Sequence, residues 1–113
     1  MLDIDCLSKV VYHEARGEPI LGQQTVAHVV LNRAERWKRP ICAIVYAPSQ
    51  FSWTSKVVSS PFGSSWLLAK EIAGNLGPDP TGGALYFHNT SVHPSWANKK
   101  QFTVQIGRHK FYK

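Results

Sequence analysis

The spacing of the apolar residues changes once along this chain of 113 residues, at the turn sequence PDPTGG (78–83). Before that turn the apolar residues recur at the spacing of amphipathic helices. After it they alternate with polar residues, as in half-buried strands. Helices followed by a small antiparallel sheet make an α+β fold, and the length is that of one ordinary domain with its own core. We therefore predict a single α+β domain over residues 1–113.

The first expected helix begins at Asp3, where Asp3 or Asp5 is available to cap the first amides. Gly17 and Pro19 end this helix, because proline disfavours helical geometry at the residue before it, here Glu18. The other expected helices cover about 22–36, the stretch PICAIVY (40–46) with Pro40 at the first helical position, and 64–77. The expected strands cover 84–89 and 102–106. Gly107 and Arg108 are expected to form a two-residue turn into HKFYK (109–113).

Glu14 falls on the apolar face of the first expected helix, seven residues after Leu7 and three after Val11. Burial disfavours the charged form of a carboxylic acid, so we expect a raised pKa for Glu14, which suits a general acid. The spacing equally allows an ion pair of Glu14 with a nearby cation. The candidate cations are Arg16, His28 and Arg33.

The formal charge of +6 predicts attraction to polyanions, which include nucleic acid, anionic lipid and anionic cell-wall polymers. The basic residues are spread along the chain, which weakens the case for nucleic acid. The start of the chain, MLDID, lacks the basic and apolar regions of a secretion signal, and no apolar run approaches the roughly 18 residues that span a bilayer. We therefore expect synthesis in the cytoplasm and no membrane insertion.

Several common catalytic patterns are missing. The tract HEARG (13–17) departs from the zinc-protease signature H-E-x-x-H, because Gly17 stands where the second histidine belongs. The chain has no phosphate-binding P-loop and no G-x-S-x-G elbow. Cys6 and Cys42 lie in apolar helical stretches, where we expect reduced core residues. We predict no metal site and no cofactor.

Aromatic side chains and short polar groups gather in the stretches 50–53 and 86–89. Flat rings beside hydroxyl and amide groups suit the faces and hydroxyls of sugars, although aromatic residues at such positions are also common in protein cores. The predicted substrate-binding residues are Gln50, Phe51, Ser52, Trp53, Tyr86, His88 and Asn89.

Six tracts follow one another in order along nearly the whole chain: EARGEP (14–19), GQQTVAHVVLNRA (22–34), QFSW (50–53), DPTGGALYFHN (79–89), Trp96 and IGRHKFY (106–112). On these tracts the sequence resembles the SleB/CwlJ cell-wall hydrolase family, which contains spore-cortex-lytic enzymes and their phage and bacterial relatives. The resemblance implies a small lysozyme-like domain related to lytic transglycosylases, acting on peptidoglycan. It also implies that Glu14 is the catalytic acid and base, and that the bond cleaved joins N-acetylmuramic acid to N-acetylglucosamine.

A glycosidase that uses water normally needs two carboxyl groups, whereas a transglycosylase can use one. Glu18 is the residue to test as a second carboxylate, because Glu35 and Glu71 have the setting of solvated or paired charges and Asp79 lies in a turn. The alternative for Glu18 is structural, and we favour it. It would accept backbone amides at the start of the second helix or pair with Arg33.

We therefore expect a peptidoglycan lytic transglycosylase or muramidase that acts as a monomer on glycan strands, without stable membrane insertion and without binding nucleic acid. The missing secretion signal suggests a phage lysin that reaches the cell wall with help, or a domain cut from a larger protein. Two alternatives stay open: an N-acetylmuramoyl-L-alanine amidase, and a non-catalytic basic module that binds cell wall or nucleic acid.

Overall fold

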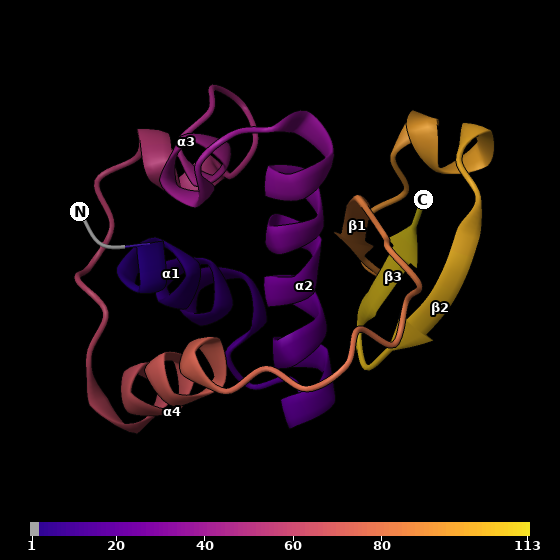
Figure 1. Cartoon of the computed structure of the whole chain (residues 1–113). Helices are drawn as coiled ribbons and strands as arrows, with labels where there is room; N and C mark the ends of the chain where they lie inside the picture. The colour runs from indigo at the N-terminus through magenta and orange to yellow at the C-terminus, as the bar shows by residue number, and fades with distance from the viewer. Residues whose placement is uncertain (1–2) are drawn as a thin grey trace.

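A computed structural model describes residues 3–113, in which four α-helices precede three strands (Figure 1). This order confirms the predicted α+β fold. The helices are α1 (Asp3–Ala15), α2 (Ile20–Trp37), α3 (Ile41–Val45) and α4 (Gly63–Gly74); the strands are β1 (Tyr86–Asn89), β2 (Phe102–Ile106) and β3 (His109–Tyr112); two short 3-10 helices, η1 (Ser52–Ser55) and η2 (Ser95–Lys99), lie in the loops.

Helix α1 is the centre of the helical part, because α2, α3 and α4 all pack against it. The helix ends where predicted. Gly17 has a φ of +86°, a left-handed conformation that favours glycine, and the backbone N–H of Glu18 donates to the carbonyl of Ala15 at 3.0 Å. Glu14 therefore lies in the last turn of α1.

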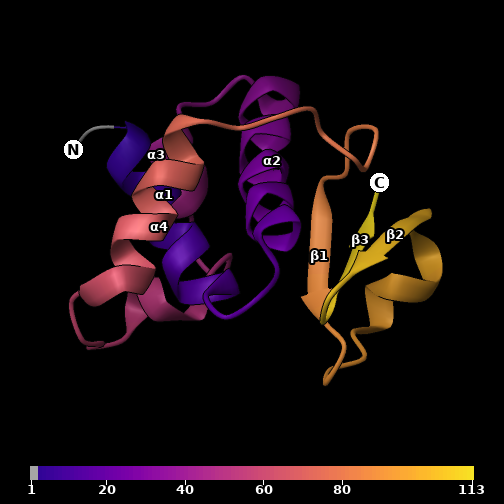
Figure 2. The ribbon, with the colours of Figure 1, turned by 90° about the horizontal axis from the view of Figure 1, so that it is seen from below.

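Helix α2 lies between the other helices and the sheet (Figures 1 and 2). It begins at Ile20, two residues before the predicted start, because Pro19 has the conformation of a residue that precedes a helix. Its Val26, Val29 and Val30 are fully buried. Although α2 is the longest helix described, no helix within residues 3–113 combines the length and apolar character needed to cross a bilayer.

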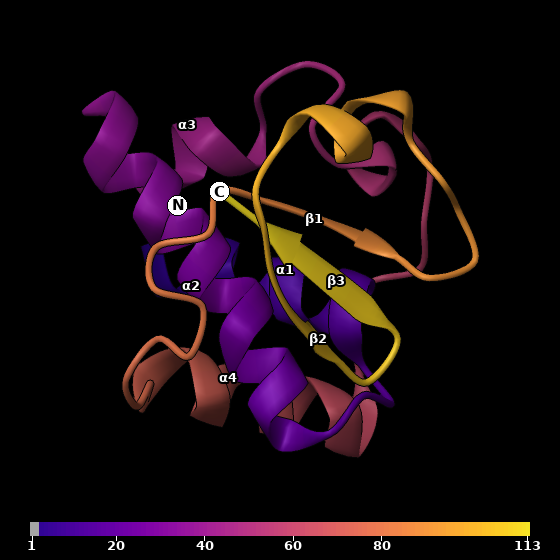
Figure 3. The same ribbon diagram turned by 90° about the vertical axis from the view of Figure 1, so that its right-hand side faces the viewer.

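The three strands form an antiparallel sheet in the order β1-β3-β2 (Figure 3). Phe111 of the central strand is fully buried and faces Phe87 of β1 in the register. The predicted turn at 107–108 joins β2 to β3. Strand β1 begins at Tyr86, two residues later than predicted, although the N–H of Leu85 already donates to the carbonyl of Tyr112 at 2.9 Å.

Helix boundaries also differ from the sequence prediction at α3 and α4. Helix α4 ends at Gly74 and not at residue 77, because Asn75 leaves the helical conformation with a φ of −141°. Pro40 precedes α3 as its N-cap and is not its first residue. Asp3 and Asp5 both lie in the first turn of α1, so Asp5 is inside the helix and does not precede it.

The expectation that Cys6 and Cys42 are reduced was wrong, because the two residues form a disulfide. Cys6 is fully buried in α1, and Cys42 is half-buried in α3. Because α3 packs against α1, their Cα atoms lie 5.4 Å apart across 36 residues of sequence. Helical spacing places each cysteine on an apolar face but does not say which helix that face meets.

Candidate active site

Glu14 is half-buried and forms no ion pair with any residue in 3–113. Burial raises the pKa of Glu14 above its ordinary value, because desolvation disfavours the charged carboxylate. The raised pKa expected from its place on the apolar face is therefore present, and its cause is desolvation.

The three cations offered by the sequence as partners of Glu14 are engaged elsewhere. The Arg16 guanidinium lies 4.4 Å from the centre of the Tyr12 ring. His28 Nε2 lies 2.7 Å from the carbonyl oxygen of Gly77. Arg33 donates to a carbonyl and an amide oxygen described below. Within the described residues, the ion-pair alternative for Glu14 is not realised.

A cavity of about 290 Å³ opens beside Glu14. It lies between the end of α1, the C-terminal half of α2, the loop before η1, and strands β1 and β3. Four of the predicted substrate-binding residues line it together with Glu14. They are Gln50, Phe51, His88 and Asn89.

A second cavity of about 360 Å³ shares Arg33, Gln50 and Phe87 with the first, so the two adjoin. We call these two cavities together the groove. Tyr86 lines the second cavity as predicted, and its ring lies 5.8 Å from that of Trp96. The groove thus combines a half-buried acid, amide groups and aromatic rings, which is the chemistry that suits a sugar chain.

Ser52 and Trp53 line neither cavity of the groove. Ser52 is exposed in η1. Trp53 is buried behind Phe51, with the two rings stacked at 6.1 Å, and its ring also lies 4.4 Å from that of His13 and 6.1 Å from that of Tyr46. Trp53 therefore supports the wall of the groove through Phe51, and a direct contact with substrate stays a prediction for both residues.

The two ring nitrogens of His88 are both engaged within the protein. Nδ1 lies 2.8 Å from the carbonyl oxygen of Asn89, so Nδ1 carries the proton and donates. Nε2 then accepts from the hydroxyl of Tyr112 at 2.9 Å. Asn89 is exposed at the mouth of the cavity, where its side-chain oxygen accepts the N–H of Ser91 at 2.9 Å. His88 therefore meets the cavity with its ring and not with a free nitrogen.

The Glu18 carboxylate contacts the β2–β3 hairpin and not the backbone amides at the start of α2 or Arg33. Its Oε1 accepts the backbone N–H of Arg108 at 2.7 Å, and its Oε2 lies 3.3 Å from Arg108 Nε. The carboxylate is nearly buried, with 7% of the side chain exposed, and lies 3.9 Å from His109 Nδ1. The partners named for Glu18 from the sequence were therefore wrong, and its role, structural or as a second carboxylate, stays a prediction.

Arg33 and His109 line the Glu14 cavity and were missed as site residues. Arg33 is buried in α2 and donates from Nε to the carbonyl of Leu85 at 2.6 Å and from a terminal nitrogen to Oε1 of Gln50 at 3.1 Å. Burial lowers the pKa of His109, against the opposite effect of the nearby Glu18 carboxylate. Arg33 follows Val29 and Val30 on the apolar face of α2. A charged residue on an apolar helix face was the observation that singled out Glu14, and it could have singled out Arg33 as well.

Within residues 3–113, no three His, Cys, Asp or Glu side chains are grouped so that they could hold a metal ion.

A family model described as Cell Wall Hydrolase matches residues 17–112. Similar proteins include the spore cortex-lytic enzymes of Bacillus cereus and Oceanobacillus iheyensis, each 34% identical over 98% of this chain, and that of Bacillus subtilis, 30% identical over 96%. This chain spans 44%, 41% and 37% of these three proteins, so it corresponds to less than half of each.

Two solved structures share the fold over 98% of this chain. The catalytic domain of the germination-specific lytic transglycosylase SleB from Bacillus anthracis has a TM-score of 0.79 and 31% identity, and 93% of it is covered. The catalytic domain of the Bacillus cereus SleB protein has a TM-score of 0.76 and 32% identity, and 89% of it is covered. From the family match and the agreement in fold, the chain belongs to the cell wall hydrolase family.

Proposed function

We propose that this chain is the catalytic domain of a peptidoglycan lytic transglycosylase that cleaves the β-1,4 bond between N-acetylmuramic acid and N-acetylglucosamine. The observation that carries the proposal is Glu14, a half-buried acid with a raised pKa and no ion-pair partner in the described residues, beside a cavity with aromatic and amide walls. The named similarity to a lytic transglycosylase catalytic domain supports it.

In the first step, protonated Glu14 donates its proton to the glycosidic oxygen as the bond from the anomeric carbon breaks. In the second step, the Glu14 carboxylate takes the proton of the muramic acid 6-hydroxyl, whose oxygen attacks the anomeric carbon and closes a 1,6-anhydro ring. The attack is intramolecular, so proximity supplies what a second carboxylate and a bound water would otherwise provide.

The commitment of Glu18 to the hairpin favours a mechanism with one carboxylate over hydrolysis with two. The hydrolytic muramidase is the nearest alternative, and its product differs from the anhydro product by one added water. The amidase and the non-catalytic binding module make other predictions: an amidase releases peptides and leaves the glycan strands intact, and a binding module releases nothing.

The test is a digest of purified peptidoglycan by wild type and by Glu14→Gln, with the products identified by mass spectrometry. We expect anhydro-muramoyl ends from wild type and at least about a hundredfold loss of kcat in Glu14→Gln, the lower range for loss of a general acid. Reducing ends would assign hydrolysis instead. Full activity of a folded Glu14→Gln variant would refute the role of Glu14.

The relatives named above are spore cortex-lytic enzymes, which gives no support to the expectation of a phage lysin. We infer that the natural substrate is a bacterial cell wall, with spore cortex as the first material to test. Action as a monomer and organisation as a single domain stay predictions, to be checked by light scattering and limited proteolysis.

A further inference from the structure

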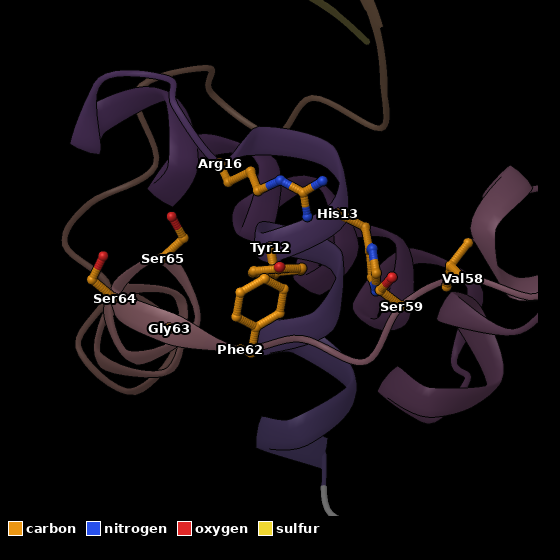
Figure 4. Close-up of a pocket in the computed structure, with 9 residues that line it drawn as sticks. All are labelled: Tyr12, His13, Arg16, Val58, Ser59, Phe62, Gly63, Ser64 and Ser65. Carbon is orange, nitrogen blue, oxygen red and sulfur yellow. The ribbon is translucent and has the colours of Figure 1, made fainter.

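A second hollow of about 630 Å³ lies beside the last turn of α1 (Figure 4), and it shares no lining residue with the groove. It lies between Tyr12, His13 and Arg16 on one side and the segment 58–65 on the other. Tyr12 is two positions before Glu14, which is about 200° around a helix, so the hollow and the groove occupy different faces of the same helix end. Arg16 belongs to the tract EARGEP, in which Glu14 and Glu18 already have assigned places.

The lining of this hollow suits an anion. The Arg16 guanidinium is held over the Tyr12 ring at 4.4 Å, as Figure 4 shows, and has no carboxylate partner in the described residues. Ser59 lies beside His13, and the hydroxyls of Ser64 and Ser65 lie across the hollow. No acidic residue lines it. A guanidinium among hydroxyl groups is a donor set for a carboxylate and for peptide carbonyls.

His13 adds a polar group whose neutral form is favoured by its surroundings. Burial is the largest cause of the lowered pKa of His13, and the positive charges of Arg16 and Lys9 lower this pKa further. Its ring is fixed by stacking on Trp53, which in turn stacks on Phe51 in the wall of the groove. The hollow is therefore joined to the groove through packed rings.

We propose that this hollow binds the stem peptide of peptidoglycan, with one of its free carboxylates held by Arg16. The inference rests on the proposed function, because the peptide is attached to the muramic acid residue that Glu14 would face. A stem peptide of about four residues reaches roughly 14 Å when extended. That reach exceeds the roughly 10–12 Å diameter of a helix, so the peptide can pass over the end of α1 from the groove to Arg16.

The test compares two substrates. One is glycan strands that carry stem peptides, and the other is the same strands after an amidase has removed the peptides. We expect Arg16→Gln to raise KM about tenfold on the first substrate, the effect of losing a charge-assisted hydrogen bond, without changing kcat. On the second substrate both constants should equal those of wild type. The matched control is Arg36→Gln, which removes the same charge from an exposed position on α2. It should leave KM and kcat unchanged on both substrates.

A binding measurement separates this inference from the proposed function. The free stem tetrapeptide is titrated into wild type and into Glu14→Gln, with NMR signals of the Arg16 and His13 side chains as the readout. Shifts of equal size in both proteins support the site whether or not the protein cleaves glycan. The proposal is overturned if the peptide shifts neither signal, or if Arg16→Gln raises KM equally on both substrates.

Discussion

At the residue scale, Glu14 shows a conflict between chemistry and stability. Its carboxyl group is desolvated, and no cation in the described residues compensates the charge that it carries when ionised. A desolvated acid is well suited to hold a proton for donation. The same desolvation makes the ionised form unfavourable in the folded protein, so the residue that we propose for catalysis lowers the free energy of unfolding near neutral pH.

The pH dependence of stability follows from the sign of this shift. Because burial raises the pKa of Glu14, the folded protein binds more protons at this site than the unfolded chain at pH values between the unfolded and folded pKa. Stability therefore falls as pH rises through that window, and the loss is complete above it. We predict that Glu14→Gln has a higher free energy of unfolding than wild type at pH 7 and an equal one at about pH 3.5, where the carboxyl is protonated in both states.

The measurement is urea denaturation of both proteins at the two pH values. Glu35→Gln is the matched control, because it makes the same substitution at an exposed position on α2 and should leave the difference between the two pH values unchanged. A Glu14→Gln variant that is less stable than wild type at pH 7 would show that the carboxylate has a stabilising partner, and would contradict the desolvated environment described above.

At the scale of elements, Glu18 joins the end of α1 to the β2–β3 hairpin. The contact depends on Gly107, whose φ is +57° and where a Cβ atom would collide with Glu18 Oε1. The side chain of Arg108 is 74% exposed, so its ion pair with Glu18 contributes little. The stronger contact is the hydrogen bond from the Arg108 backbone to a nearly buried carboxylate.

We predict that Glu18→Ala lowers the free energy of unfolding by about 2 kcal/mol, the range for a hydrogen bond to a charged group. Arg108→Ala keeps the backbone N–H and should cost under about 1 kcal/mol.

Glu18→Gln keeps an acceptor oxygen and should retain most of the kcat of wild type. Denaturation curves and rates on peptidoglycan measure these effects. A folded Glu18→Gln variant with a kcat reduced by about a hundredfold or more would instead make Glu18 a second catalytic carboxylate.

The elements themselves could be predicted from the sequence because their signals are local. Apolar spacing located the helices, and Gly17 with Pro19 located the end of α1, within the distance over which backbone preferences act. The partner of Glu18 could not be predicted in the same way, since Arg108 lies 90 residues away along the chain. The hairpin lies beside Glu18 because the sheet packs beside α2.

At the scale of the whole molecule, the groove needs both halves of the chain. The acid comes from α1, the buried cation Arg33 from α2, and the ring of His109 from the last strand. Helical spacing and the resemblance pointed to Glu14, and the mixture of aromatic and polar residues pointed to several wall residues, but the sequence does not show which side of a ring faces solvent. Trp53 illustrates this, because its ring supports Phe51 from behind, although both residues belong to one short tract of the sequence.

The disulfide is the long-range contact that most constrains the unfolded chain. Cys6 and Cys42 are separated by 36 residues and join α1 to α3. Closing a loop of that size is expected to contribute about 2–4 kcal/mol to the free energy of unfolding. Cys6 precedes Glu14 by eight residues, roughly 12 Å along the helix axis, so the disulfide stabilises α1 without taking part in the groove.

We predict that the double variant Cys6→Ala, Cys42→Ala loses about 2–4 kcal/mol of unfolding free energy, whereas its kcat/KM on peptidoglycan, measured well below the melting temperature, equals that of wild type. Dithiothreitol should lower the melting temperature of wild type toward that of the variant and should leave the variant unchanged. A wild-type protein whose melting temperature does not respond to dithiothreitol, with two thiols found by titration under native conditions, would show that the cysteines are not joined. A variant that keeps its stability but loses activity would show that the disulfide affects the geometry of the groove, since α1 carries Glu14 at its other end.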